Sequence, residues 1–167
     1  TSDKVAELLG YTRYSSGQMV RKIIKQRGLT LEEFNKIATD DHSIDSEVDE
    51  GLRNLRDKEN IVVDSRLGFY WIPESFKVYL DLDIDVASVR IYKDIDENAA
   101  RTGETAPSMQ HVAQQVRSRM RHDQDRFKAL YGVDPYDTSH FDLVINTSRH
   151  SPQTVALTVF DNYRQWL

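Results

Sequence analysis

The sequence predicts an α/β fold in which helices cover both faces of a parallel sheet. Three short segments have the apolar character of strands, and they occupy residues 61–64, 76–82 and 141–146. Between them, apolar residues recur every three or four positions, which is the period of an amphipathic helix. Strands that alternate with helices are joined by crossovers and therefore run parallel. Because the chain has no repeat, low-complexity tract or linker, we expect residues 1–167 to form a single domain.

Start and stop signals divide the first sixty residues into short elements. A helix over 3–9 is expected to end at Gly10 and a helix over 18–26 at Gly28, because glycine readily adopts the left-handed conformation that ends helices. Residues 11–14 are β-prone. The other expected elements are a helix opened by the capping box of Thr30 and Glu33, with Phe34 and Ile37 as apolar positions, and a helix over 43–58.

Similar signals order the rest of the chain. A helix over 84–94 is expected after the second strand, and the polar residues 96–107 are expected to form a mobile loop. A long arginine-rich helix should cover about 108–131. Ser151 and Pro152 open the closing helix, since serine suits the N-cap and proline suits the first turn.

The composition excludes several classes of protein. The chain has 167 residues, a formal net charge of −5 and a pI near 5.5, so a general affinity for DNA or RNA is not expected. It has no cysteine, and hence neither disulfides nor zinc-thiolate sites, which fits a cytoplasmic protein. No apolar run reaches the roughly 20 residues of a membrane span. Because the chain starts at Thr1 without a methionine, we expect a trimmed chain or a preceding segment.

A local concentration of positive charge points to a small anionic ligand. Residues 117–126 read R-S-R-M-R-H-D-Q-D-R, with four arginines and two aspartates. On a helix, Arg119, Asp123 and Arg126 stand at i, i+4 and i+7 and share one face. Two guanidinium groups around one carboxylate suit a phosphate, although a solvated helix with surface ion pairs would show the same pattern.

Two further segments offer phosphate-binding groups. Ser16 and Gly17 lie in a serine turn at a helix N-terminus, with Arg21 one turn further on. Asp64 and Arg66 follow a buried strand directly, where ligands bind in open α/β sheets. Asp64 could hold a loop backbone, and Arg66 could reach into the crevice. The alternative for the first segment is a capped helix with a surface arginine. For Arg66 the alternative is a structural ion pair.

Other polar residues give weaker signals. Asn146 ends the last strand and could border a nucleobase or ribose, or could simply begin a loop. The five histidines show no metal-ligand spacing, and the alternation of Asp81 and Asp83 is weak evidence for Mg²⁺. We therefore assign no metal ligands among the protein side chains.

Taken together, four motifs in order resemble the cytidylate kinases, and most closely the short archaeal-type branch. They are S-S-G-x-x-x-R from Ser15, V-x-D-x-R from Val62, R-x-x-x-D-x-x-R from Arg119 and D-L-V-I-N-T-S-x-x-S-P from Asp142. The resemblance covers nearly the whole chain. It implies a P-loop NTPase-type three-layer fold with a helical lid over about 96–128 and an acceptor-binding helical region over about 15–58.

The resemblance also implies an activity and a role for each matching residue. The activity is phosphoryl transfer from ATP, with Mg²⁺, to CMP or dCMP, by a cytoplasmic protein that is a monomer and binds neither nucleic acid nor membrane. Ser16, Gly17, Arg21, Asp64 and Arg66 match the acceptor site. Arg119, Asp123 and Arg126 match the catalytic lid. Thr1 and Ser2 lie where the donor-phosphate loop would end, and Asn146 would lie near the donor nucleotide.

Some positions depart from the family pattern. Val20 replaces a frequent aromatic residue, Glu50-Gly51-Leu52 replaces a basic-basic-Gln run, and Leu67 stands where bacterial members place an aspartate that reads the base. The second departure leaves room for a kinase that acts on another small acceptor.

The largest departure concerns the donor site, because the chain contains no G-x-x-x-x-G-K-[ST] motif or Gly-Ser-Gly-Thr variant. The resemblance places an absent strand between the strands that end at Asp64 and near Leu82, so we expect that roughly ten to fifteen residues precede Thr1 in the sheet. The printed chain is then expected not to turn over ATP. A catalytically inactive nucleotide-binding or regulatory module is the alternative.

Overall fold

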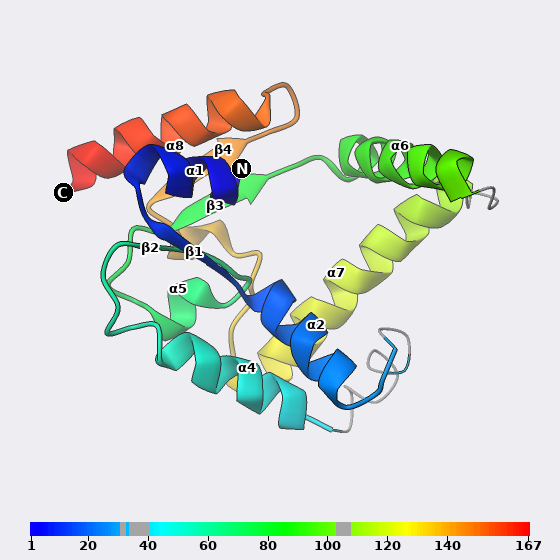
Figure 1. Ribbon diagram of the computed structural model, residues 1–167, viewed down its shortest axis with the longest axis horizontal. Helices are drawn as coiled ribbons and strands as arrows, with labels where there is room; N and C mark the ends of the chain where they lie inside the picture. The colour runs from blue at the N-terminus through cyan, green and yellow to red at the C-terminus, as the bar shows by residue number, and fades with distance from the viewer. Residues whose placement is uncertain (31–32, 34–40, 103–107) are drawn as a thin grey trace. The chain divides into compact units, whose positions relative to one another are not determined.

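The structure is a computed structural model that describes residues 1–30, 33, 41–102 and 108–167 (Figure 1). Contacts between residues divide the chain into two compact units. The first comprises Thr1–Val78, Ser139–Leu143 and Ser151–Leu167, and the second comprises Tyr79–Thr138 and Val144–His150. Each unit is described separately below.

The first unit contains two strands and five of the described helices. Its elements are α1 (Ser2–Leu9), β1 (Thr12–Ser15), α2 (Ser16–Gln26), α4 (Ser43–Arg53), β2 (Ile61–Asp64), α5 (Gly68–Trp71) and α8 (Pro152–Trp166). The predicted stop at Gly10 is confirmed, because this residue has a φ of 68° and its N–H bonds to carbonyls of α1. The predicted start at Ser151 is also confirmed, because its side chain accepts a hydrogen bond from the Thr154 N–H.

Strands β1 and β2 are parallel, and their register separates a polar face from an apolar one. Arg13 is opposite Val62, and Ser15 is opposite Asp64. Since side chains alternate along a strand, Arg13, Ser15 and Asp64 share one face of this pair. On the other face, Tyr14 and Val63 pack against the hydrophobic core. The core therefore covers one side of the pair and leaves the other side to polar contacts.

That core lies mainly between α2 and α4. Its buried residues are Ile23, Ile24, Ile44, Val48, Leu52 and Leu55. Ile44, Val48, Leu52 and Leu55 are spaced by three or four residues, which is the pattern that predicted the helix of α4. The helix of α2 was predicted from its start and stop signals instead. Elsewhere in the same unit, α1 lies beside α8 (Figure 1), with Val5 and Ala6 buried on α1 and Val155, Ala156 and Val159 buried on α8.

The second unit is dominated by two long helices, α6 (Ile84–Thr102) and α7 (Met109–Tyr131), which pack against each other. Ser108 caps α7 by accepting a hydrogen bond from the His111 N–H, and Gly132 ends the helix with a φ of 68°. The strands β3 (Val78–Asp81) and β4 (Leu143–Asn146) form a second two-stranded sheet, and a short helix, η1, covers Thr138–His140. Among the described residues, β2 and β3 thus belong to different sheets.

Several predicted boundaries were wrong. The helix expected over 43–58 ends at Arg53, where the chain enters turns with short-range hydrogen bonds at Leu55 and Arg56. The helix expected over 84–94 continues to Thr102, so residues 96–102 are not a loop; Glu and Ala in this stretch favour a helix without requiring an apolar stripe. Helix α5 was not predicted, because four residues are too few to show a period.

Two expectations concern residues around 31–40 and 103–107. The capping box is confirmed, because the Glu33 N–H donates to the Thr30 hydroxyl at 3.1 Å and the Thr30 N–H donates to the Glu33 carboxylate at 2.7 Å. The positions Phe34 and Ile37, and the part of the expected loop beyond Thr102, lie outside the described residues.

No helix within the described ranges is long and apolar enough to cross a membrane.

Candidate nucleotide site

The first helix after β1 presents an N-terminus suited to an anion. Ser15 is at the N-cap, in extended conformation, and its side chain makes no capping hydrogen bond. Ser16 and Gly17 form the first turn of α2, whose leading N–H groups have no partner within the helix. These N–H groups, together with the positive end of the helix dipole, favour a negatively charged ligand.

Arg21 brings a formal charge to the same turn. Its two terminal nitrogens lie 3.7 and 3.8 Å from the position that a Cβ would occupy at Gly17, so the guanidinium group folds back over the start of its own helix. A side chain larger than alanine at position 17 would displace it. The side chain of Arg21 is exposed. The predicted grouping of Gly17 and Arg21 is therefore present in the structure.

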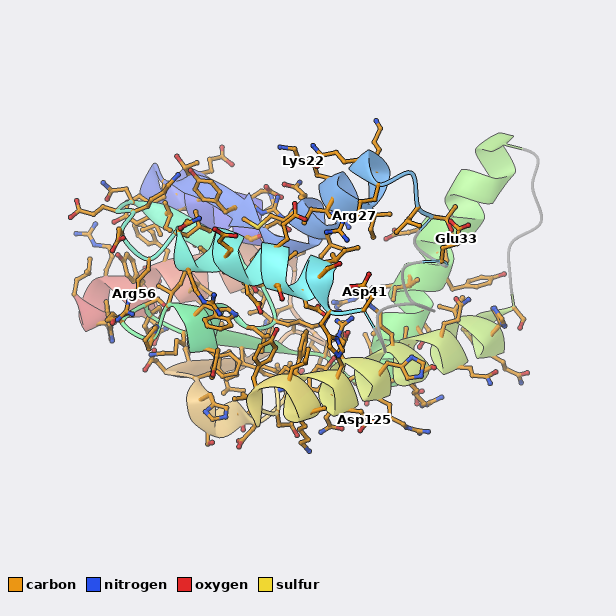
Figure 2. All side chains as sticks on the ribbon, turned by 90° about the horizontal axis from the view of Figure 1, so that it is seen from below. Lys22, Arg27, Glu33, Asp41, Arg56 and Asp125 are labelled. Carbon is orange, nitrogen blue, oxygen red and sulfur yellow. The ribbon has the colours of Figure 1, made fainter. Side chains whose placement is uncertain are left out.

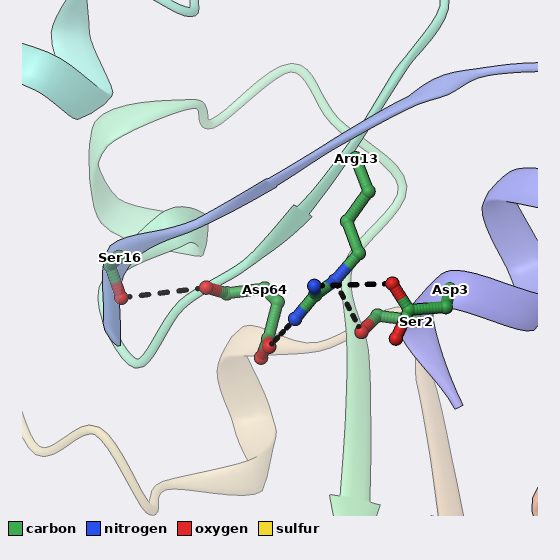
Figure 3. Close-up of polar contacts among 5 residues, drawn as sticks. All are labelled: Ser2, Asp3, Arg13, Ser16 and Asp64. Atoms are coloured by element: carbon green, nitrogen blue, oxygen red, sulfur yellow. Dashed lines mark hydrogen bonds and ion pairs between the residues drawn. The ribbon is translucent and has the colours of Figure 1, made fainter. Parts of the chain in front are cut away.

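Asp64, at the end of β2, is held by an arginine that the sequence analysis did not single out (Figure 3). Arg13 donates to Asp64 Oδ2 at 2.9 Å and to Ser2 Oγ at 2.9 Å, and its third nitrogen lies 3.1 Å from Asp3 Oδ1. The Arg13 side chain is 22% exposed, whereas those of Asp64 and Asp3 are 53% and 79% exposed. Arg13 thus joins the start of α1 to the end of β2.

A contact between backbone and side chain extends this network to α2. Ser16 Oγ donates to the backbone oxygen of Asp64 at 3.4 Å, a long hydrogen bond. Asp64 therefore contacts Ser16 directly and the first turn of α1 through Arg13; in α1, Ser2 is the first helical residue and Thr1 is the N-cap. Register could have revealed Arg13, because it is the diagonal neighbour of Asp64 on the shared face of the sheet.

Arg66 follows Asp64 in a turn fixed by Ser65. The Ser65 hydroxyl accepts a hydrogen bond from the Leu67 N–H at 3.2 Å, and Leu67 is buried with 4% exposure. Arg66 lies between these two anchored residues and is exposed. Its position immediately beyond the carboxyl end of β2 is the one predicted.

In the second unit, the predicted face of α7 contains a partly buried ion pair. Arg126 donates to Asp123 Oδ1 at 3.2 Å, and the two side chains are 21% and 11% exposed. The guanidinium group of Arg126 also lies 4.8 Å from the centre of the Phe127 ring, which is a cation–π contact. Arg119, one turn before Asp123, is exposed. The aspartate therefore orients one arginine of the face.

Other charges on the two long helices have structural partners. Arg117 pairs with Asp85 at 3.0 Å, between α7 and α6. Asp134, just after α7, lies 3.0 Å from Lys128. Although burial raises the pKa of Asp134, hydrogen bonds from the Tyr136 N–H and from Gln124 lower it by more, so its carboxylate stays ionised.

Asn146 holds the loop that follows β4. Its amide donates to Asp81 Oδ2 at 3.2 Å and its carbonyl oxygen accepts from the Ser148 N–H at 3.0 Å. Arg90 donates to the backbone oxygens of Thr147 and Ser148 at 3.0 and 3.1 Å. The sequence analysis missed Arg90, because no local pattern connects a helical arginine to a loop 57 residues away.

Asp81 has a second effect at this point. Burial, followed by the negative charge of Asp81, raises the pKa of Tyr79 above its usual value. Among the described residues, no three His, Asp or Glu side chains come together as a metal site. Asp64 and Asp81 are both hydrogen-bonded to protein groups. Mg²⁺ usually binds proteins through phosphate oxygens, water and one or two carboxylates.

One departure from the family pattern has a structural counterpart. At Gly51 on α4, a Cβ would lie 3.3 Å from the sulfur of Met19 on α2. A side chain at position 51 would therefore require Met19 to move. Where the family carries a basic residue in this run, the present chain has a close contact between two helices.

The first unit contains the parts of a nucleotide-binding α/β protein: parallel strands, a helix N-terminus with an arginine after β1, and an arginine after β2. The family model described as the cytidylate kinase-like family matches residues 2–149. The chain belongs to this family, and so to the nucleoside monophosphate kinases.

Two relatives named cytidylate kinase agree with this assignment. Cytidylate kinase from Pyrococcus horikoshii is 33% identical over 155 residues, which are 92% of this chain and 76% of the relative. Cytidylate kinase from Natronomonas pharaonis is 32% identical over 158 residues, or 93% and 77% of the two chains. A longer relative, the S-adenosylmethionine-dependent nucleotide dehydratase of Lacinutrix mariniflava, is 33% identical over 164 residues, which are 97% of this chain and 32% of that protein.

Proposed function

We propose that this chain provides the acceptor site and the lid of a single-domain kinase that transfers the γ-phosphoryl group of ATP to CMP or dCMP. The products are the nucleoside diphosphate and ADP. The observation that supports this most strongly is the arrangement at the start of α2. There, uncapped N–H groups and the folded-back Arg21 lie in the unit that also carries Arg66 at the end of β2. Two arginines and a helix N-terminus are suited to the phosphate of the acceptor.

The chemistry requires little acid–base catalysis. The attacking atom is a phosphate oxygen of the acceptor, which is already ionised at neutral pH, so no strong general base is needed. The main obstacle is repulsion between two anionic nucleotides. Positive groups that surround the transferred phosphoryl group lower this barrier by positioning and electrostatic stabilisation.

In this proposal, Ser16, Gly17, Arg21, Asp64 and Arg66 bind the acceptor. Arg21 and Arg66 contact its phosphate, and the backbone oxygen of Asp64 holds Ser16 at the start of α2. In the lid, Arg119 and Arg126 contact the phosphoryl groups, with Asp123 orienting Arg126. Mg²⁺ bound to ATP supplies further charge neutralisation. Asn146 shapes the loop beside the donor nucleotide, and Thr1 and Ser2 mark the end of the donor-phosphate loop.

The donor-phosphate motif is not found within the 167 residues. We therefore propose that the printed chain binds the acceptor and does not by itself transfer phosphate. We further propose that the protein acts in the cytoplasm, where its nucleotide substrates are found, as a monomer that binds neither nucleic acid nor membranes.

Phosphoryl transfer is tested in the natural gene product that contains this chain. ADP release is measured by a coupled assay with ATP, Mg²⁺ and CMP, dCMP, UMP or AMP as acceptor. We expect release with CMP and dCMP. No release with any acceptor would contradict the kinase proposal, whereas release with UMP or AMP alone would change the acceptor.

A matched pair of substitutions tests the lid. Arg119→Ala is expected to lower kcat at least 100-fold with little change in melting temperature, because Arg119 is exposed. Arg121→Ala is the control: it removes the same charge from the same helix, but two residues away on a different face. An equal decrease of kcat in the two variants would argue against a lid role. So would a decrease of kcat in Arg119→Ala that is matched by a lower melting temperature.

One observation favours a second candidate function. Glu50-Gly51-Leu52 lacks the basic residues of the family pattern, and the close contact of Met19 with Gly51 occupies that position. The chain could accordingly act on another small acceptor, or bind a nucleotide as a regulatory module of a larger protein, as its similarity to part of the Lacinutrix protein allows. Binding of an acceptor without ADP release in the natural gene product would favour the regulatory module.

A further inference from the structure

A hollow of about 410 Å³ lies in the first unit, lined by Arg53, Arg56, Tyr70, Trp71 and Pro73. Arg53 ends α4, Arg56 lies in the turns after it, and the other three residues lie in α5 or just after it. None of them is among the five residues proposed above to bind the acceptor. Figure 2 shows Arg56 well apart from Lys22 on α2 and from Arg27, which caps the end of that helix. The hollow is therefore separate from the helix that carries Arg21.

The aromatic wall of the hollow is held in place from the core. Trp71 donates its indole N–H to Asp49 Oδ1 at 2.9 Å, and Asp49 is buried with 5% exposure. Burying a carboxylate is costly unless it is hydrogen-bonded, so this contact fixes the indole firmly. Tyr70 meets Trp71 edge-on, with ring centres 4.7 Å apart and planes at 82°. Tyr70 is 38% exposed.

The two arginines supply the charge. The guanidinium group of Arg53 lies 4.0 Å from the centre of the Trp71 ring, stacked on one face. A guanidinium group held in this way keeps its N–H donors and its outer face for another planar group. Arg56 forms an ion pair with Glu74 at the surface, where both side chains are more than half exposed and the pair is weak. Since Glu74 and the buried Asp49 offset the two arginine charges, an anionic ligand binds Arg56 by displacing this weak pair.

From these contacts we propose that the hollow is a second ligand site, specific for a nucleoside di- or triphosphate. The base stacks on the Arg53–Trp71 platform beside Tyr70, and the phosphates bind Arg53 and Arg56. Planar rings favour stacking on arginine and aromatic side chains, and guanidinium groups bind phosphate through paired hydrogen bonds. The volume is within the range of small-molecule pockets. This site is independent of the proposed phosphoryl transfer.

Trp71 itself provides the assay, because the chain has only two tryptophans. In the full 167-residue chain with Trp166→Phe, Trp71 is the single fluorescent indole. This variant is titrated with CTP, ATP and, for comparison, inorganic pyrophosphate. We expect a saturable change in fluorescence with CTP or ATP and at least tenfold weaker binding of pyrophosphate, which has no base.

Three substitutions in this background locate the site. Arg56→Gln is expected to weaken binding at least fivefold while the protein stays folded, since it removes only an exposed ion pair. Arg53→Gln together with Arg56→Gln is expected to abolish binding. Lys22→Gln, which removes a charge from exposed α2, and Arg21→Ala, which removes the acceptor-site arginine, should each leave the affinity within twofold.

Several results would overturn the proposal. They are the absence of a saturable change with either nucleotide, equal affinity for pyrophosphate, and a loss of affinity in Arg21→Ala or Lys22→Gln comparable to that in Arg56→Gln. Melting curves of each variant separate loss of binding from loss of fold. Should the double variant unfold, Arg56→Gln alone decides the outcome.

Discussion

Replacing Arg13 with glutamine should loosen the connection between α1 and the end of β2. Arg13 makes three polar contacts, with Ser2, Asp3 and Asp64, at 2.9, 3.1 and 2.9 Å. The contact with Asp3 contributes at most about 1 kcal/mol, because Asp3 is 79% exposed and the pair is screened by water. The charged hydrogen bond to Asp64 contributes about 1–2 kcal/mol, reduced because Asp64 is itself half exposed.

The sum is a loss of about 2 kcal/mol in the free energy of unfolding. For a chain of this size, that corresponds to a decrease of about 4–8 °C in melting temperature. Urea unfolding followed by tryptophan fluorescence is a suitable assay, because Trp71 and Trp166 both belong to the first unit. Lys25→Gln on α2 removes an exposed charge and should change the stability by less than about 0.5 kcal/mol.

A second substitution tests the physical reason. If Arg13 acts mainly through Asp64, the double variant Arg13→Gln with Asp64→Asn should lose about as much stability as Arg13→Gln alone, since both changes remove the same interaction. An effect of Arg13→Gln below about 0.5 kcal/mol, or strictly additive losses in the double variant, would refute the reasoning.

Three other predictions concern stability. Arg126→Ala should cost about 2–4 kcal/mol by leaving the Asp123 carboxylate, whose side chain is 11% exposed, without its arginine; Asp123→Asn should recover part of this loss in chemical unfolding. Leu52→Ala removes a side chain with 1% exposure from the core and should cost about 2–5 kcal/mol in urea unfolding; a cost below about 1 kcal/mol would contradict the packing described. The hydrogen bond with Tyr11, followed by burial, raises the pKa of Tyr163 from 10.0 to about 12. The stability that neutral Tyr163 contributes should therefore be fully present below pH 10 and be lost between pH 10 and 12. Tyr163→Phe should flatten this decline, and an unchanged pH profile in that variant would contradict the prediction.

Elements defined by local chemistry could be predicted from the sequence. Gly10 and Gly132 end helices in the left-handed conformation, and Ser151 caps the closing helix through its side chain. The pairing of Asp123 with Arg126 follows from spacing on a helix, because residues three apart face the same way. These features depend on neighbours in sequence, and a pattern of neighbours is what a sequence displays.

Contacts that depend on register or on distant segments could not be predicted in the same way. Arg13 meets Asp64 only because β1 and β2 pair in one register, and Arg90 meets the loop after β4 across 57 residues. The buried Asp49 that holds Trp71 looks like any charged residue of an amphipathic helix until α5 packs against α4. The contact of Met19 with Gly51 similarly needs the spacing of two helices.

Binding of the acceptor is the most direct test of the central claim, that Arg21 and Arg66 form an acceptor-phosphate site. Calorimetric titration of the 167-residue chain with CMP and dCMP should show saturable binding. This binding should weaken at least tenfold in Arg21→Ala and in Arg66→Ala, and should stay within twofold in the control Lys25→Gln. The absence of binding to either nucleotide, or equal affinity in the wild type and both arginine variants, would contradict the account.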